Sequence, residues 1–207
     1  APTFVNGVWG PYYGAMLPGL YLNEGGQSAA GALIDHVIAS HSAAGELNAA
    51  AEAAGVPPAV YLNRRLEQMA SDEGGGAVGV ASLASDVHVT PDFIGNRSPL
   101  ADPSMRGGVI GLGMSSTLDD LARLYLATVQ ALAYQTRSIV DALGYDDPAI
   151  SEVVACGGLS KNDLYVATHA DVLGLPIHIP VQEEAVLLGA AILGAAAGGA
   201  HESVEAA

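Results

Sequence analysis

Apolar side chains recur at helical spacing over the longest patterned stretch of the chain, from about residue 118 to residue 143. They form one face, at Leu118, Leu121, Leu124, Thr128, Leu132, Ile139 and Leu143. Ser116 stands in front as a candidate N-cap, and Asp119 and Asp120 suit the positive end of a helix dipole. The pattern predicts a long amphipathic helix whose apolar face covers a core.

Helical spacing or helical composition also marks four shorter segments, at about 28–40, 42–75, 163–173 and 184–197. The second segment is alanine-rich, and Gly55-Val56-Pro57-Pro58 interrupts it, because glycine and proline break helices. We interpret residues 42–85 as a variable helical insertion at the periphery of the domain. Residues 198–207 are expected to fray.

Short runs of apolar or alternating residues predict strands between these helices, at 19–22, 87–89, 109–112, 153–155 and 177–181. Strands that alternate with helices are typical of an α/β domain in which helices cover a sheet. No internal repeat and no clear interdomain linker interrupts the pattern. At 207 residues, half of them hydrophobic, the chain is long enough to bury one good core.

The formal net charge of −15 limits the possible partners. Lys161 is the only lysine, so the clustered cations that nucleic-acid binding needs are missing. No uninterrupted apolar run of about 18 residues occurs, which argues against a membrane partner. Cys156 is the only cysteine, which excludes an internal disulfide and fits a reducing, cytoplasmic location. Its position after an apolar run predicts a buried, inert thiol.

Two strand–glycine–helix units are the most informative pattern. Gly25-Gly26 precedes one predicted helix, and Gly157-Gly158 precedes another. Glycines at such turns let a ligand lie against the backbone, and the free N–H groups at a helix start favour acceptor groups. Turns at one end of a shared sheet would form a cleft for a flat ring such as adenine. Asn162 would offer that ring both a donor and an acceptor. Each turn is equally compatible with an ordinary structural βα connection.

Other candidate chemistry is sparse. The loop at 92–103 holds Arg97, which we expect to pair with Asp92 or Asp102 as a structural anchor, with an anionic ligand as the alternative. Lys161 is either a solvated loop lysine or part of the site at the glycine turn. The six histidines are scattered without metal-ligand spacing, and no nucleophile elbow or Walker loop occurs. We therefore expect no metal ligands and no covalent catalysis within this chain.

Four blocks, taken in order, resemble the C-terminal domain of the FGGY carbohydrate kinases. They are residues 7–12 (Gly-Val-Trp-Gly-Pro-Tyr) with 22–31 (Leu-Asn-Glu-Gly-Gly-Gln-Ser-Ala-Ala-Gly), residues 91–103 (Pro-Asp-Phe-Ile-Gly-Asn-Arg-Ser-Pro-Leu-Ala-Asp-Pro) with 106–112, the long helix from 118, and residues 157–162 (Gly-Gly-Leu-Ser-Lys-Asn) with 169–176. The match covers nearly the whole chain except the segment at 42–85. Its first block is most similar to the ribulokinase-like branch, whose substrates are pentuloses.

The resemblance implies an α/β domain of the actin-like ATPase (ribonuclease H-like) fold, with a mixed sheet flanked by helices and incomplete at its N-terminus. It implies that residues 1–207 are the nucleotide-binding domain of a kinase that uses ATP and Mg²⁺. The implied adenosine contacts are Gly157, Gly158, Asn162 and Gly31, with Asp35 one turn after Gly31. Some relatives carry an amide at the Asp35 position, and Lys161 is not a required family contact.

The resemblance also implies that essential parts lie outside this chain. The aspartate that acts as general base and its phosphate loop are expected before residue 1, and most of the sugar pocket belongs to that missing N-terminal domain. We expect the chain alone to be inactive and, because an interrupted fold exposes apolar surface, to form homo-oligomers. The alternative is a non-catalytic nucleotide-binding or protein-interaction domain that retains only the fold.

Overall fold

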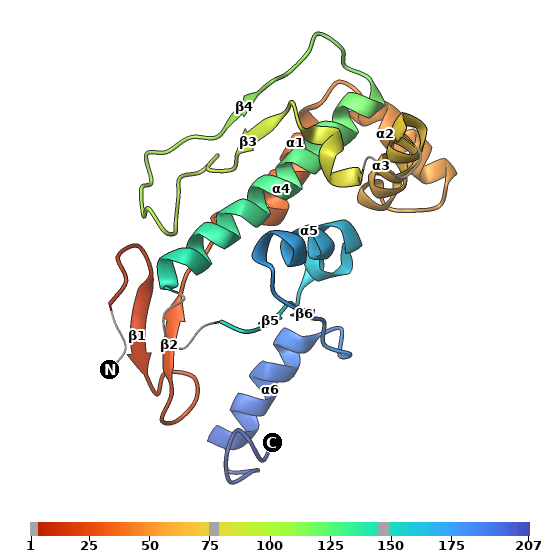
Figure 1. Ribbon diagram of the computed structural model, residues 1–207. Helices are drawn as coiled ribbons and strands as arrows, with labels where there is room; N and C mark the ends of the chain where they lie inside the picture. Colours follow the sequence, from red (N-terminus) through yellow and green to blue (C-terminus); the bar gives the residue numbers. More distant parts are fainter. Residues whose placement is uncertain (1–3, 75–78, 145–149) are drawn as a thin grey trace.

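The computed structural model describes residues 4–74, 79–144 and 150–207, and its elements are labelled in Figure 1. In chain order they are β1 (Trp9–Tyr13), β2 (Tyr21–Glu24), α1 (Ala30–Ser40), α2 (Ala44–Ala53), α3 (Pro58–Gly74), the 3-10 helix η1 (Val80–Ala84), β3 (His88–Thr90), β4 (Gly108–Ile110), α4 (Leu118–Leu143), β5 (Val153–Val154), the 3-10 helix η2 (Gly158–Lys161), α5 (Asp163–Leu173), β6 (Ile177–His178) and α6 (Ala185–Ala197).

The strands form three separate two-stranded sheets. The pairs β1–β2 and β3–β4 are antiparallel, whereas β5–β6 is parallel, with Val153 opposite Ile177. The predicted mixture of strands and helices is confirmed, but β2 and β5 do not share a sheet. Each described strand is only two to five residues long and pairs with a single neighbour, so the two glycine turns do not meet at one sheet end.

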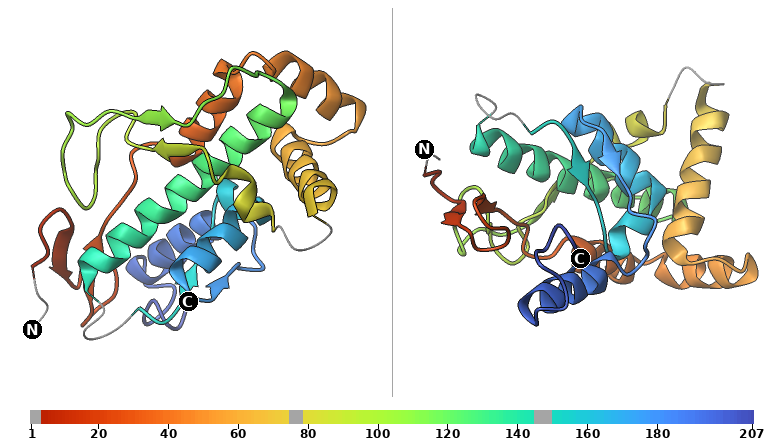
Figure 2. Two further views of the ribbon diagram at one scale, coloured as in Figure 1. Left: turned by 45° about the horizontal axis from the view of Figure 1, so that its top comes forward. Right: turned by 90° about the horizontal axis from the view of Figure 1, so that it is seen from below.

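The core surrounds α4, the long central helix of Figure 1. Leu121, Tyr125 and Leu132 of α4 are essentially fully buried. Leu62 and Leu66 of α3 belong to the same apolar cluster and are also inaccessible to solvent. Both views of Figure 2 place α3 beside the first turns of α4. The 42–85 segment therefore builds part of the core, and the peripheral position predicted for it is wrong, because its helices carry apolar residues at core spacing.

Helix α4 begins at Leu118, as predicted, but its N-cap lies one residue later than expected. Thr117, rather than Ser116, is the N-cap, and its hydroxyl accepts a hydrogen bond from the backbone N–H of Asp120 at 3.4 Å. The Asp120 carboxylate in turn accepts from the Thr117 N–H at 2.8 Å, which completes a capping box. Hydrogen bonds from Ser115 and Thr117 lower the pKa of Asp120 to about 2. The sequence offers three consecutive hydroxyls at residues 115–117, and the hydrogen bonds with Asp120 identify Thr117 as the cap.

The C-terminal part packs differently from this core. No residue of α6 is buried, and apolar side chains are exposed on and before it, at Ile179, Val181, Val186, Leu187, Leu188 and Leu193. In Figure 1 the helix extends away from α4, beyond the small β5–β6 sheet. Residues 198–207 contain no helix or strand. Within the part of the chain that the structure describes, no helix is long and apolar enough to cross a membrane.

Candidate functional site

The predicted strand–glycine–helix unit is present at residues 153–173. After β5 the chain turns at Gly157, whose φ of +92° lies in a region that side chains other than glycine rarely adopt. Residues 158–161 form one 3-10 turn, and Asn162 then caps α5. A Cβ atom added to Gly157 or Gly158 would meet no atom within 4 Å, so the backbone here has an open face.

Gly31 lies close to this turn although it is far away in the sequence. It belongs to the first turn of α1, and a Cβ atom added there would lie 4.0 Å from Cγ of Leu159. Asp35, one helical turn later, is exposed. The structure thus brings Gly31 to the turn that contains Gly157 and Gly158.

The other glycine pair lies elsewhere. A Cβ atom at Gly25 would come within 2.7 Å of Cγ2 of Ile139, near the end of α4, and one at Gly26 would contact Arg97 at 3.4 Å. A side chain at Gly25 would therefore collide with α4, and the Gly25-Gly26 turn lies against Ile139 and Arg97 rather than against the second glycine turn. The two glycine pairs therefore do not form the cleft that the sequence predicted. Instead, Gly31 contacts the turn that contains Gly157 and Gly158.

Asn162 is held in a network of side chains. Its Oδ1 accepts from the Tyr165 backbone N–H at 3.3 Å and from Nδ2 of Asn63 at 3.0 Å. Its Nδ2 donates to the Tyr125 hydroxyl at 2.8 Å, and that hydroxyl donates to Oδ1 of Asn63 at 3.0 Å. Because both lone pairs of Oδ1 are used, Asn162 does not offer the free acceptor that the sequence suggested.

Asn63 and Tyr125 were not among the predicted site residues. Burial raises the pKa of the Tyr125 phenol, although the hydrogen bond from Asn162 acts in the opposite direction, so the hydroxyl keeps its proton and can donate. The only signal in the sequence was a tyrosine within the apolar run of α4, since a buried tyrosine hydroxyl needs a partner. The identity of that partner depends on how three helices meet.

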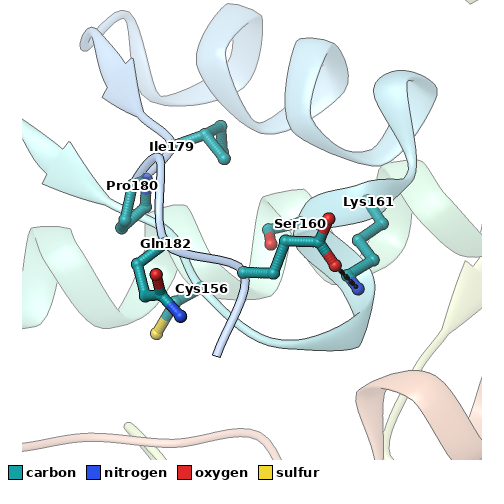
Figure 3. A pocket seen from close by; sticks show the side chains of 7 residues that line it. Cys156, Ser160, Lys161, Ile179, Pro180 and Gln182 are labelled. Carbon is teal, nitrogen blue, oxygen red and sulfur yellow. Dashed lines mark hydrogen bonds and ion pairs between the residues drawn. The ribbon is translucent and has the colours of Figure 1, made fainter. Parts of the chain in front are cut away.

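A pocket of about 240 Å³ lies beside the turn (Figure 3). It is lined by Cys156, Ser160, Lys161, Ile179, Pro180, Gln182 and Glu183. Nζ of Lys161 pairs with Glu183 at 3.1 Å, with both side chains largely exposed, and Ser160 donates to the Gly157 carbonyl at 2.7 Å. Lys161 is thus a surface lysine that joins the turn to the segment before α6.

Cys156 is exposed, so the predicted buried thiol is wrong. The apolar run before it forms a strand with a single neighbour, and Val154 on that strand is also exposed. Within the described ranges, no group of three or more histidine, cysteine, aspartate or glutamate side chains gathers to hold a metal ion.

Arg97 anchors its loop, as predicted, but through a different acid. Its guanidinium pairs with Glu24 of β2 at 2.6 Å and lies over the Trp9 ring, 4.7 Å from the ring centroid. Asp92 instead accepts from Asn96 and Gln135, both neutral amides. The β1–β2 hairpin approaches the loop in space, which the local sequence does not show.

Comparison with known proteins identifies the family. Residues 1–198 match the profile of the FGGY family of carbohydrate kinases, C-terminal domain. An FGGY carbohydrate kinase domain-containing protein of Xenopus laevis is 54% identical over 99% of this chain, and a D-ribulokinase of Saccharomyces cerevisiae is 42% identical over 95%. The chain spans 36% and 27% of those two proteins, respectively.

Solved structures agree with this match. The structure described as a xyloylose kinase from Brucella ovis is 25% identical with a TM-score of 0.55, over 79% of this chain and 31% of that one. A ligand-bound xylulose kinase from Lactobacillus acidophilus, 21% identical, has a TM-score of 0.53 over 76% of this chain and 30% of its own. These neighbours confirm the expected actin-like ATPase fold. The chain therefore belongs to the FGGY family of carbohydrate kinases and corresponds to its C-terminal domain.

Proposed function

We propose that this chain is the nucleotide-holding part of a kinase that transfers the γ-phosphate of ATP to a hydroxyl of a carbohydrate, a pentulose such as ribulose. Membership of a carbohydrate kinase family supports the reaction class, and the relatives named ribulokinase support the sugar class. One structural observation carries the site: Gly31 of α1 lies against Leu159 of the glycine turn. The start of α1 and the glycine turn, which are far apart in the sequence, thereby adjoin.

In this proposal the adenosine lies on the open backbone at Gly157 and Gly158, with Gly31 beside it. One N–H of the Asn162 side-chain amide donates to Tyr125, and the other is the group that Asn162 contributes to the nucleoside in this proposal. Asp35 is exposed near the same place and contacts the nucleoside only if its carboxylate can accept a hydrogen bond from it.

The phosphates require groups from outside this chain. With a net charge of −15, the chain repels a polyanion, so neutralising charge has to come with the ligand or from another domain. Mg²⁺ characteristically binds substrate phosphates and few protein carboxylates. No metal cage forms among the described side chains, so Mg²⁺ enters in this proposal as the complex with ATP.

The chain alone is then expected to have no turnover, because the general base and the sugar-contacting residues belong to the rest of the kinase. Coupled measurement of ADP release with ribulose as substrate checks this expectation. Pentulose-dependent ADP formation by the 207-residue chain would contradict it.

A calorimetric titration of MgADP tests the site. Gly158→Val places a side chain on the open face, where its Cβ meets no atom within 4 Å, and the side chain should block the ligand there. Gly108→Val on β4 is the matched control, since a Cβ there also meets nothing within 4 Å. We expect saturable binding, weakened at least about tenfold by Gly158→Val and unchanged by Gly108→Val. Equal affinity in both variants would remove the turn from the nucleotide site.

The exposed apolar surface of α6 favours a second role, as an interaction surface. We propose that it associates with a second copy of the chain when the chain is studied alone. Sedimentation velocity should then show concentration-dependent dimers or larger species, and Leu187→Asp with Leu193→Asp should reduce them. A strictly monomeric wild-type chain would contradict this. Cytoplasmic location stays a prediction.

A further inference from the structure

Asn63, Tyr125 and Asn162 form a closed ring of three hydrogen bonds that joins three helices. Asn63 lies on α3, Tyr125 on α4, and Asn162 at the start of α5. The three links measure 3.0, 3.0 and 2.8 Å, and every member donates once and accepts once. In a ring of this kind, each group fixes the orientation of the next.

The ring taken alone has two possible directions, because flipping both amides and turning the hydroxyl would reverse all three bonds. The backbone N–H of Tyr165 removes this ambiguity. It points at the Asn162 side chain from 3.3 Å and can only be satisfied by an oxygen. The acceptor of Asn162 is therefore fixed toward Asn63 and Tyr165, and its NH₂ group toward Tyr125.

Helix α3 is itself held firmly against α4. Arg65, two residues after Asn63, makes two contacts with the Asp119 carboxylate, at 2.6 and 2.8 Å. Leu62 and Leu66 on the same helix are inaccessible to solvent. Asn63 is therefore placed by a rigid support rather than by a mobile loop.

We propose that Asn63 and Tyr125 are positioning residues for the nucleotide site. This proposal rests on the function proposed above. They present Asn162 as a pure hydrogen-bond donor: its second N–H takes no part in the ring, and both lone pairs of its oxygen are used. The atom that Asn162 binds is then an acceptor of the nucleoside, a ribose oxygen or a ring nitrogen, and not an amino group. Helix α3 of the 42–85 segment is thereby part of the support of the site.

Three variants test the proposal by MgADP calorimetry. Tyr125→Phe removes only the hydroxyl of the ring, and Tyr165→Phe is the matched control, since its hydroxyl is also substantially buried but lies outside the ring. Asn162→Asp keeps an N-capping oxygen and removes the donor. We expect affinity to fall roughly three- to tenfold in Tyr125→Phe, at least about tenfold in Asn162→Asp, and not at all in Tyr165→Phe.

A merely structural role is distinguished by two further measurements on the same variants. MgADP should shift the Asn162 side-chain amide signals in ¹⁵N-edited spectra, and the shift should shrink in Tyr125→Phe. In Tyr125→Phe and Tyr165→Phe, the changes in MgADP affinity should also not parallel the changes in melting temperature. Unchanged affinity in Tyr125→Phe, or tight binding by Asn162→Asp, would overturn the positioning role while leaving the proposed function intact. Failure of the wild-type chain to bind MgADP would overturn both.

Discussion

The two ends of the glycine turn at residues 157–162 adjoin regions of opposite character. On one side, α5 packs against α4, and Asn162 at its start is hydrogen-bonded to α3 and α4 in a closed ring beside fully buried apolar residues. On the other side, the segment leading to α6 is joined to the turn by the exposed Lys161–Glu183 pair, and no residue of α6 is fully buried. The first region has the contacts of a folded core, whereas the second has exposed apolar surface.

This difference separates the part of the proposed site that packs within the chain from the part that lies on exposed surface. The chain spans about a third of the length of its curated relatives. In those longer proteins, additional polypeptide is available to cover surface that is exposed in this chain. The Asn162 side of the turn is complete within the described residues, because its partners come from α3 and α4. The Lys161 side is held by an exposed ion pair with Glu183.

The largest loss of stability is expected from a substitution in the core around α4. Leu66→Ala removes a fully buried side chain from α3 and should lower the free energy of unfolding by about 2–5 kcal/mol. Leu187→Ala on α6, where the side chain is 65% exposed, is the matched control and should change it by less than about 0.5 kcal/mol. Urea unfolding followed by circular dichroism measures both. Similar losses in the two variants would mean that α6 is packed as tightly as the core.

The next effect concerns the start of α4, on which the core depends. Thr117→Ala removes the capping box and should destabilise the chain by about 0.5–2 kcal/mol.

The pH dependence of stability tests the same cap. The pKa of Asp120 is about 2, below its ordinary value of 3.8, so the stability that Asp120 contributes is present above pH 3.8 and is lost as the pH falls through 2. Stability curves between pH 5 and pH 2 should therefore be flatter in Asp120→Asn. An equally steep fall in that variant would assign the acid sensitivity to other carboxylates.

A smaller effect is expected where α3 is tied to α4. A double-mutant cycle with Arg65→Ala and Asp119→Ala should give a coupling of about 0.5–1 kcal/mol, since the pair is bidentate but about one-third exposed. The coupling should fall when salt is raised from low concentration to about 1 M, because salt screens such pairs. A coupling near zero at low salt would show that apolar packing alone holds α3 in place.

The smallest effect is expected across the boundary between the two regions. The side chains of Lys161 and Glu183 are 59% and 79% exposed, so a cycle with Lys161→Ala and Glu183→Ala should give less than about 0.5 kcal/mol. Chemical denaturation of the four proteins measures it. A coupling above about 1 kcal/mol would show that the segment before α6 is fixed to the turn even in the isolated chain.

The sequence predicted the helices well where periodicity and breakers act locally. The face of α4 and the break between α2 and α3 at residues 55–58 follow from spacing, glycine and proline alone. The resemblance singled out Gly31 and Gly157, and the structure places Gly31 beside the turn. Whether these residues bind a nucleotide stays a prediction.

What the sequence could not predict depends on contacts between distant segments. Glu24 pairs with Arg97 because a hairpin approaches a loop, although nearer acids were available in the sequence. Cys156 is exposed because β5 has a single partner strand, which an apolar run does not indicate. The ring of Asn63, Tyr125 and Asn162 requires three helices to meet, and a single sequence contains no trace of that geometry.

Amide hydrogen exchange of the 207-residue chain, with and without saturating MgADP, tests most directly whether the nucleotide lies between α1 and the glycine turn. We predict slower exchange at residues 157–165 and in the first turn of α1, with no change in the β3–β4 hairpin, which lies outside the proposed site. Protection confined to other segments, or none at saturating ligand, would contradict the account.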